Sequence, residues 1–114
     1  MTLTESPQRE ARHAIRADVR LSGMAGEAHG GEMLAEGVMI DLSRHGMGTD
    51  GLIHFPPESA VHVTFPDGTT RTGTAMWHDS FWSGIRFDAP LTSGELARLI
   101  ATLERKPHFI RHTA

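Results

Sequence analysis

Apolar and polar residues alternate over several short stretches of the chain, and this pattern predicts β-strands. The clearest example is 61–65, where valine and phenylalanine take one face while His62 and Thr64 take the other. Pro66-Asp67-Gly68 then predicts a tight turn, because proline fixes φ, aspartate bonds to its own backbone and glycine accepts positive φ. The β-branched stretch from Thr69 to Trp77 completes a predicted hairpin.

Shorter signals of the same kind predict further strands on both sides of this hairpin. The glycine-rich segment 23–33 predicts a loop, and the polar residues 1–8 predict a loosely held tail. Six or so strands at hairpin spacing favour a small antiparallel barrel or sandwich. The additional strand signals lie at 19–21, at 38–42, from Met47 onward, at 52–55 and at 85–87.

The C-terminal region changes to a helical period. Thr92 and Glu95 fit a capping box, in which each side chain satisfies a free backbone N–H group of the first turn. Pro107 predicts the end of the helix. We expect the helix to cover one opening or edge of the strands. Its apolar stripe consists of Leu96, Leu99, Ile100 and Leu103.

Length and composition restrict the class of protein. A chain of 114 residues predicts one domain, and the lack of cysteine excludes disulfides and thiolate metal sites. A net charge of −3, from 11 basic and 14 acidic residues, argues against a general DNA- or RNA-binding protein. No apolar run approaches the roughly 20 residues of a membrane helix, and the N-terminus lacks signal-peptide features. A cytoplasmic protein without membrane insertion is therefore expected.

Two short motifs carry most of the candidate chemistry. The segment 9–20 is locally basic in an acidic chain and contains four arginines, which can attract a small anion such as a nucleotide. About 25 residues further on, Asp41-Leu42-Ser43-Arg44-His45-Gly46 reads D-x-S-x-x-G after an apolar strand. Neither motif contains an arrangement typical of catalysis, so a binding module is predicted in place of an enzyme.

Together these motifs resemble the R-x-x-x-R and [D/N]-x-S-x-x-G motifs of the PilZ domain family. The segment 83–87 resembles the family's closing strand, and the order of strands and helix agrees as well. The resemblance implies a six-stranded antiparallel β-barrel with a C-terminal α-helix over 9–106, flanked by tails at 1–8 and 107–114. It also implies binding of the bacterial second messenger cyclic di-GMP, without a metal or cofactor, through Arg9, Arg12, Arg16, Asp41, Ser43 and Gly46.

The motif residues suit such a ligand. An arginine can fork onto guanine O6 and N7, grip a phosphate or stack on a base. Asp41 can accept hydrogen bonds from the N1–H and amino group of guanine, a donor pair that adenine lacks. Ser43 can bond to base or phosphate and also fix the turn, while Gly46 lets the backbone bend and a ligand approach closely. Arg9, Arg12 and Arg16 are expected on a mobile arm that closes over the ligand.

The sequence leaves several alternatives open. Some PilZ domains have lost these motif residues and act as protein adaptors, so the alternative is a ligand-independent adaptor that contacts proteins of the motility or pilus machinery. The eight histidines show no metal-ligand spacing, and scattered surface histidines are the favoured interpretation. Two pairs fit R-x-x-x-R literally, Arg12 with Arg16 and Arg16 with Arg20. In typical family members the second arginine of the motif precedes the first strand by several residues. Counting back from 19–21 places Arg12 at that second position and Gln8 at the position of the first arginine, with Arg9 one residue away from it.

Overall fold

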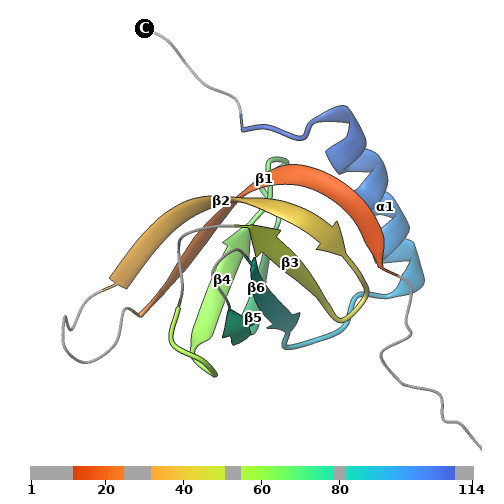
Figure 1. Cartoon of the computed structure of the whole chain (residues 1–114). Helices are drawn as coiled ribbons and strands as arrows, with labels where there is room; N and C mark the ends of the chain where they lie inside the picture. The colour runs from red at the N-terminus through yellow and green to blue at the C-terminus, as the bar shows by residue number, and fades with distance from the viewer. Residues whose placement is uncertain (1–11, 25–31, 51–54, 79–81, 110–114) are drawn as a thin grey trace, which may run out of the picture.

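The computed structural model describes residues 12–24, 32–50, 55–78 and 82–109, which form six strands and one helix (Figure 1). Residues 52–54 of the predicted strand at 52–55 and residues 25–31 of the predicted loop at 23–33 lie outside these residues. Phe55 is described and lies outside any strand, and residues 23–24 and 32–33, which were expected in the loop, belong to strands. The elements are β1 (His13–Met24), β2 (Glu32–Leu42), β3 (Gly46–Asp50), β4 (Ala60–Thr64), β5 (Thr70–His78), β6 (Trp82–Phe87) and α1 (Ser93–Arg105).

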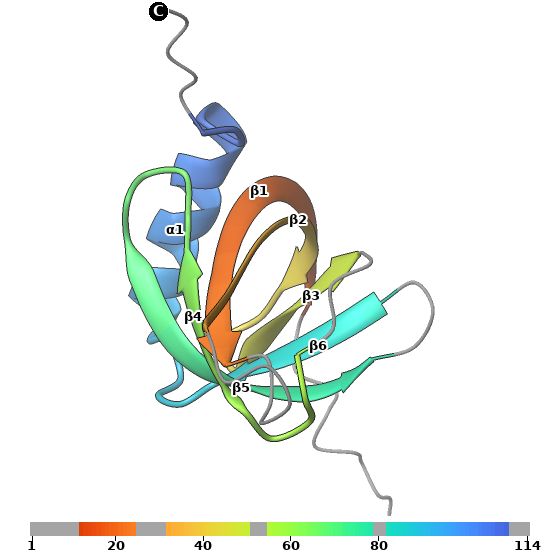
Figure 2. The same ribbon diagram turned by 90° about the vertical axis from the view of Figure 1, so that its left-hand side faces the viewer.

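The strands form a closed antiparallel barrel in the order β1-β2-β3-β6-β5-β4. Pairing of β1 with β4, for example Leu21 with Val63, closes the ring (Figure 2). The predicted six-stranded antiparallel β-barrel with a C-terminal helix is thus confirmed, and the sandwich alternative is excluded. The predicted hairpin is also confirmed as β4 and β5, joined through the 66–69 turn.

The first strand is longer than the sequence pattern predicted. It begins at His13 and pairs with β2 along its length, with a register shift between Ala14 and Ala17. Arg16 lies within this irregular stretch and is exposed. The prediction of a mobile arm is therefore wrong for Arg16, because it lies within β1 between Ala14 and Ala17, which both pair with β2.

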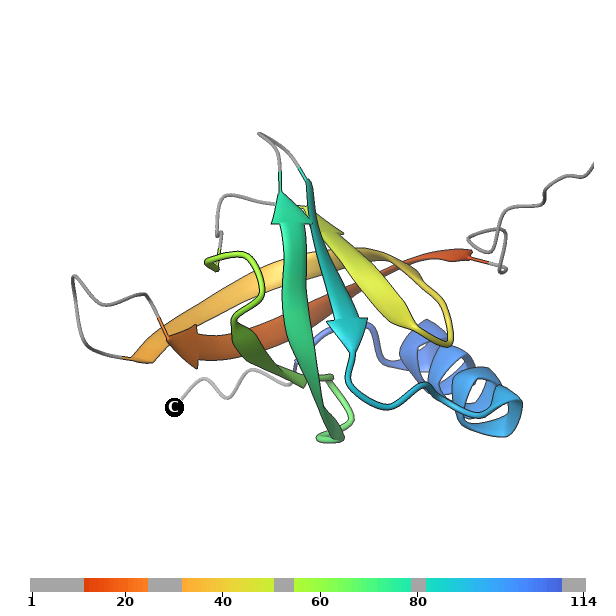
Figure 3. The same ribbon diagram turned by 90° about the horizontal axis from the view of Figure 1, so that it is seen from below.

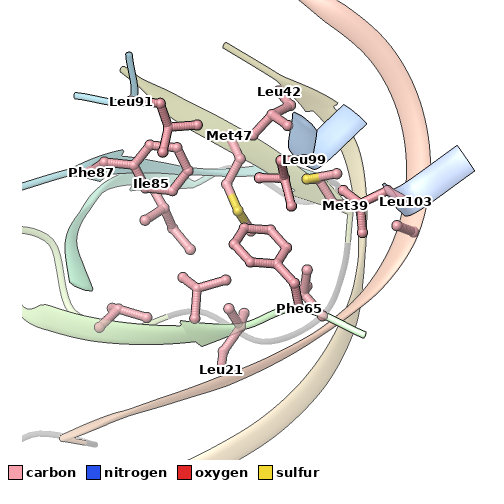
Figure 4. Close-up of a cluster of buried hydrophobic side chains, with 14 of the residues drawn as sticks. Leu21, Met39, Leu42, Met47, Phe65, Ile85, Phe87, Leu91, Leu99 and Leu103 are labelled. Carbon is pink, nitrogen blue, oxygen red and sulfur yellow. The ribbon is translucent and has the colours of Figure 1, made fainter. Parts of the chain in front are cut away.

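A single apolar core fills the barrel (Figure 4). Every strand contributes inward-facing residues, and the β4 alternation places Val61 and Val63 inside as predicted. Phe65 and Met47 are both part of this cluster and are labelled in Figure 4. Leu99 and Leu103 of α1 join the same core, so the helix packs against the barrel beside β1. Figure 3 shows α1 outside the strands, close to the turn between β2 and β3.

The start of α1 matches the predicted capping box. The Thr92 hydroxyl accepts from the Glu95 backbone N–H at 3.0 Å, and the Glu95 carboxylate accepts from the Thr92 N–H at 2.8 Å. Arg71 of β5 donates to the same carboxylate at 3.3 Å, which links the barrel to the helix. The bond from the Thr92 backbone, followed by that from Arg71, lowers the pKa of Glu95 below its ordinary value of 4.5.

This lowered pKa predicts an acid-sensitive contribution to stability. A carboxyl group with a depressed folded-state pKa stabilises the fold above its unfolded-state pKa and loses that effect as the pH falls through the folded-state value. We expect wild type to be more stable than Glu95→Gln at neutral pH, with the gap closing below pH 4.5. Urea denaturation of both proteins across this range tests it, and a gap independent of pH would contradict it.

After α1 the chain returns to β1. The Asp18 N–H donates to the Pro107 carbonyl at 2.7 Å, and the Asp18 carboxylate accepts from the Phe109 N–H at 3.4 Å. The Arg20 guanidinium lies 3.9 Å from the centre of the Phe109 ring. Residues 107–109, which the sequence pattern assigned to a tail, therefore lie against the first strand. No helix in the described part of the chain has the length and apolar character needed to cross a bilayer.

Candidate ligand-binding site

The D-x-S-x-x-G motif builds the tight turn between β2 and β3. The Ser43 N–H donates to the Gly46 carbonyl at 2.8 Å, and the Ser43 hydroxyl accepts from the N–H groups of His45 and Gly46 at 3.3 Å. Ser43 is fully buried. Its hydroxyl thus fixes the turn, the second of the two roles expected for it, because a serine side chain can bond to backbone groups two or three residues on.

Gly46 is required by the close approach of β6. A Cβ atom at this position would lie 2.3 Å from the Ile85 carbonyl oxygen, far inside van der Waals contact. Gly46 pairs with Arg86 in the ladder between β3 and β6. The glycine therefore lets two backbones approach at the place where the turn enters the barrel wall.

The same turn is bonded to the connection that leads into α1. The Phe87 N–H donates to the His45 carbonyl, and the Leu91 N–H donates to the Arg44 carbonyl, both at 2.8 Å. The Arg44 Nε donates in return to the Leu91 carbonyl at 2.8 Å. These bonds connect the turn directly to Leu91, which immediately precedes the N-cap of α1.

Asp41 brings the two predicted motifs together. Its Oδ1 accepts from Arg12 Nη2 at 2.7 Å and from the Gly48 backbone N–H at 2.9 Å. The side chains of Arg12 and Asp41 are 45% and 29% exposed, so we expect this ion pair to contribute only about 0.2–1 kcal/mol to stability. In the described residues Oδ2 has no hydrogen-bond partner, which leaves it available as an acceptor.

A pocket of about 460 Å³ surrounds this ion pair on the outer surface of the barrel. Its volume lies in the range of small-molecule sites. Three glycines line it, Gly46 and Gly48 on β3 and Gly84 on β6, and these contribute backbone without side chains of their own. The wall residues include Arg12, Ile40, Asp41, His45, Met76 and Arg86.

The predicted site residues are only partly assembled around the pocket. Arg12, Asp41, Ser43 and Gly46 all line it, although they come from distant parts of the sequence. Arg16 is not among the lining residues, and Arg9 lies outside the residues that the structure describes. Among the described residues, no group of three histidine, aspartate or glutamate side chains could hold a metal ion.

Two lining residues, Met76 and Arg86, were not singled out from the sequence. The signal for Arg86 was present, because Ile85 and Phe87 on either side are buried and strand alternation must turn Arg86 outward. Its position beside the D-x-S-x-x-G turn depends on the β3–β6 pairing, which is not encoded locally.

No protein-family model matches this chain, and no curated protein sequence matches it either.

Proposed function

We propose that this protein is a non-enzymatic receptor for cyclic di-GMP of the PilZ type. The observation that carries the proposal is the ion pair between Arg12 and Asp41 at the edge of a glycine-floored pocket. A guanidinium beside a carboxylate offers donors for phosphate or base and acceptors for a guanine edge. A bare backbone floor suits a planar base that must lie close to the barrel wall.

The hydrogen bonds at Asp41 suggest how guanine is recognised. The Gly48 N–H fixes the carboxylate, so Oδ2 is held ready to accept from a ring N–H or amino group. Oδ1 is already engaged by Arg12 and Gly48. Full bidentate recognition of guanine therefore requires Arg12 to leave Oδ1 and turn to the ligand, where a phosphate or a base can replace its carboxylate partner.

A route to a partner protein follows from the bonds of the same turn. Ligand that presses on the 43–46 turn would shift Leu91 and with it the start of α1, through the backbone bonds of Arg44. A conformational shift of this kind needs a ligand that binds the two states with different affinity. We propose that the helix passes the signal to a cytoplasmic partner in bacterial motility, biofilm or pilus control.

Isothermal titration of the purified protein with cyclic di-GMP tests the proposal. Saturable binding at micromolar or lower concentration supports it. The absence of heat from a folded protein would refute it.

The arginines are expected to contribute unequally. Arg12→Ala removes one of the arginines that line the pocket and is expected to weaken binding by about tenfold, which corresponds to roughly one charge-assisted hydrogen bond. Arg16→Ala provides a matched control, because Arg16 is a nearby exposed arginine that does not line the pocket, and it is expected to change affinity less than about twofold. Titration of both variants and of Arg9→Ala measures the order, and a larger loss for Arg16 than for Arg12 would reverse this assignment.

One observation favours a ligand-independent adaptor as the second candidate. Arg12 and Gly48 already satisfy Asp41 Oδ1, and Ser43 is buried in its turn, so these residues also stabilise the structure without any ligand. The adaptor predicts that partner capture is unchanged by cyclic di-GMP and survives Arg12→Ala. The receptor predicts capture that depends on both.

A further inference from the structure

Arg86 is a cation of the pocket without a described partner. It lies on the outward face of β6, it is exposed, and it lines the same cavity as Asp41 and Arg12. Its side chain makes no ion pair or hydrogen bond with the residues that the structure describes. The other arginines near the turn differ, because Arg12 is paired with Asp41 and Arg44 is bonded to Leu91.

The strand register fixes where Arg86 lies relative to Asp41. Asp41 of β2 is opposite Gly48 of β3, and Arg86 of β6 is opposite Gly46, two residues away on the same face. Strand spacing and rise therefore separate the two Cα atoms by roughly 12 Å across β3. On this face of β3 the residues between them are Gly46 and Gly48, so Asp41 and Arg86 flank a stretch of backbone that carries no side chains of its own.

This arrangement matches the two polar edges of guanine. One edge presents the N1–H and amino donors, and another presents the O6 and N7 acceptors. A carboxylate accepts from the first, and a guanidinium can donate two parallel bonds to the second. Adenine presents a donor beside N7, so the same arginine fork would discriminate against it.

We propose that Arg86 is a ligand-binding residue. Its guanidinium donates to O6 and N7 of one guanine, and Asp41 accepts from the N1–H and amino group of the same base. This assignment rests on the proposed function and specifies how one base is held in that site. Met76 borders the floor on the β5 side and provides an apolar edge for the same base.

The test compares cyclic di-GMP with its 7-deazaguanine analogue, which lacks the N7 acceptor. Wild type is expected to bind the analogue about tenfold more weakly, because one arm of the fork loses its acceptor. Arg86→Gln is expected to bind cyclic di-GMP about tenfold more weakly than wild type and to show no further loss with the analogue. Arg86→Lys keeps the charge without the fork and is expected to behave like Arg86→Gln.

Arg98→Gln serves as the matched control, since Arg98 is an exposed arginine of α1 that does not line the pocket. Its affinity for both ligands should equal that of wild type. Circular dichroism and thermal melting establish that each variant is folded.

The outcomes separate the two levels of the proposal. If wild type does not bind cyclic di-GMP, the proposed function itself fails. If wild type binds but Arg86→Gln binds equally well, only the assignment of Arg86 is overturned. If Arg86→Gln is weaker yet still loses affinity with the analogue, or if Arg86→Lys restores binding, the arginine contacts a phosphate and the base-edge assignment is wrong.

Discussion

Replacing Gly46 with alanine is expected to destabilise the protein by about 3 kcal/mol or more, an effect typical of steric overlap with buried backbone. The new methyl carbon would start 2.3 Å from the Ile85 carbonyl oxygen. Backbone cannot move aside as a flexible side chain can, so β3 and β6 must separate at this point. Because the turn and the glycine floor share this ladder, ligand affinity should fall with stability. Chemical denaturation measures the free energy of unfolding.

Gly94→Ala is the matched control for this substitution. Gly94 lies in the first turn of α1, and apart from its chain neighbours and the adjacent helix backbone no atom lies within 4 Å of the position that its Cβ would take. Alanine in a helix is favoured over glycine, so the control should stabilise the protein by about 0.5–1 kcal/mol. Opposite signs for the two glycines are the expected result. Unchanged stability of Gly46→Ala would mean that the contact between β3 and β6 can relax at little cost.

Asp41→Ala is expected to weaken cyclic di-GMP binding by about 100-fold and to lower stability by about 1–3 kcal/mol. A methyl group cannot accept from the N1–H and amino group of guanine, so both donors lose their partner. The Gly48 N–H loses its acceptor and Arg12 loses its ion-pair partner. Isothermal titration gives the affinity, and denaturation gives the stability.

Asp67→Ala provides the control for this loss of a carboxylate. Asp67 also uses one carboxylate oxygen to accept a backbone N–H, from Thr69 at 2.9 Å, but it lies in the β4–β5 turn and does not line the pocket. The affinity of this variant for cyclic di-GMP should equal that of wild type. Equal affinities for wild type and Asp41→Ala would exclude Asp41 from base recognition.

Local sequence rules predicted those elements whose cause is local. The alternation over 61–65, the Pro66-Asp67-Gly68 turn and the Thr92 capping box all appear in the structure because each depends on neighbouring residues. The length of β1 was underestimated. Its early part contains alanine, arginine and histidine, which carry no strong strand signal, and pairing with β2 determines its conformation.

The candidate site was predictable only in part for the same reason. The D-x-S-x-x-G spacing pointed to the turn, and the meeting of Arg12 with Asp41 agrees with the expected convergence of the two motifs. Arg86 could not be found from spacing, because its place depends on β6 pairing with β3 across a long stretch of intervening chain. The buried role of Ser43 likewise emerged only from the bonds within the folded turn.

The docking of residues 107–109 has a consequence for self-association. β1 extends beyond its pairing with β4, so without residues 107–109 one edge of this strand would present unpaired backbone N–H and C=O groups to solvent. An exposed strand edge can pair with a strand of a second molecule, which is the first step of many aggregation processes. The Pro107 carbonyl accepts from the Asp18 N–H and so satisfies part of that edge. This short segment therefore protects β1 from pairing with a strand of another molecule.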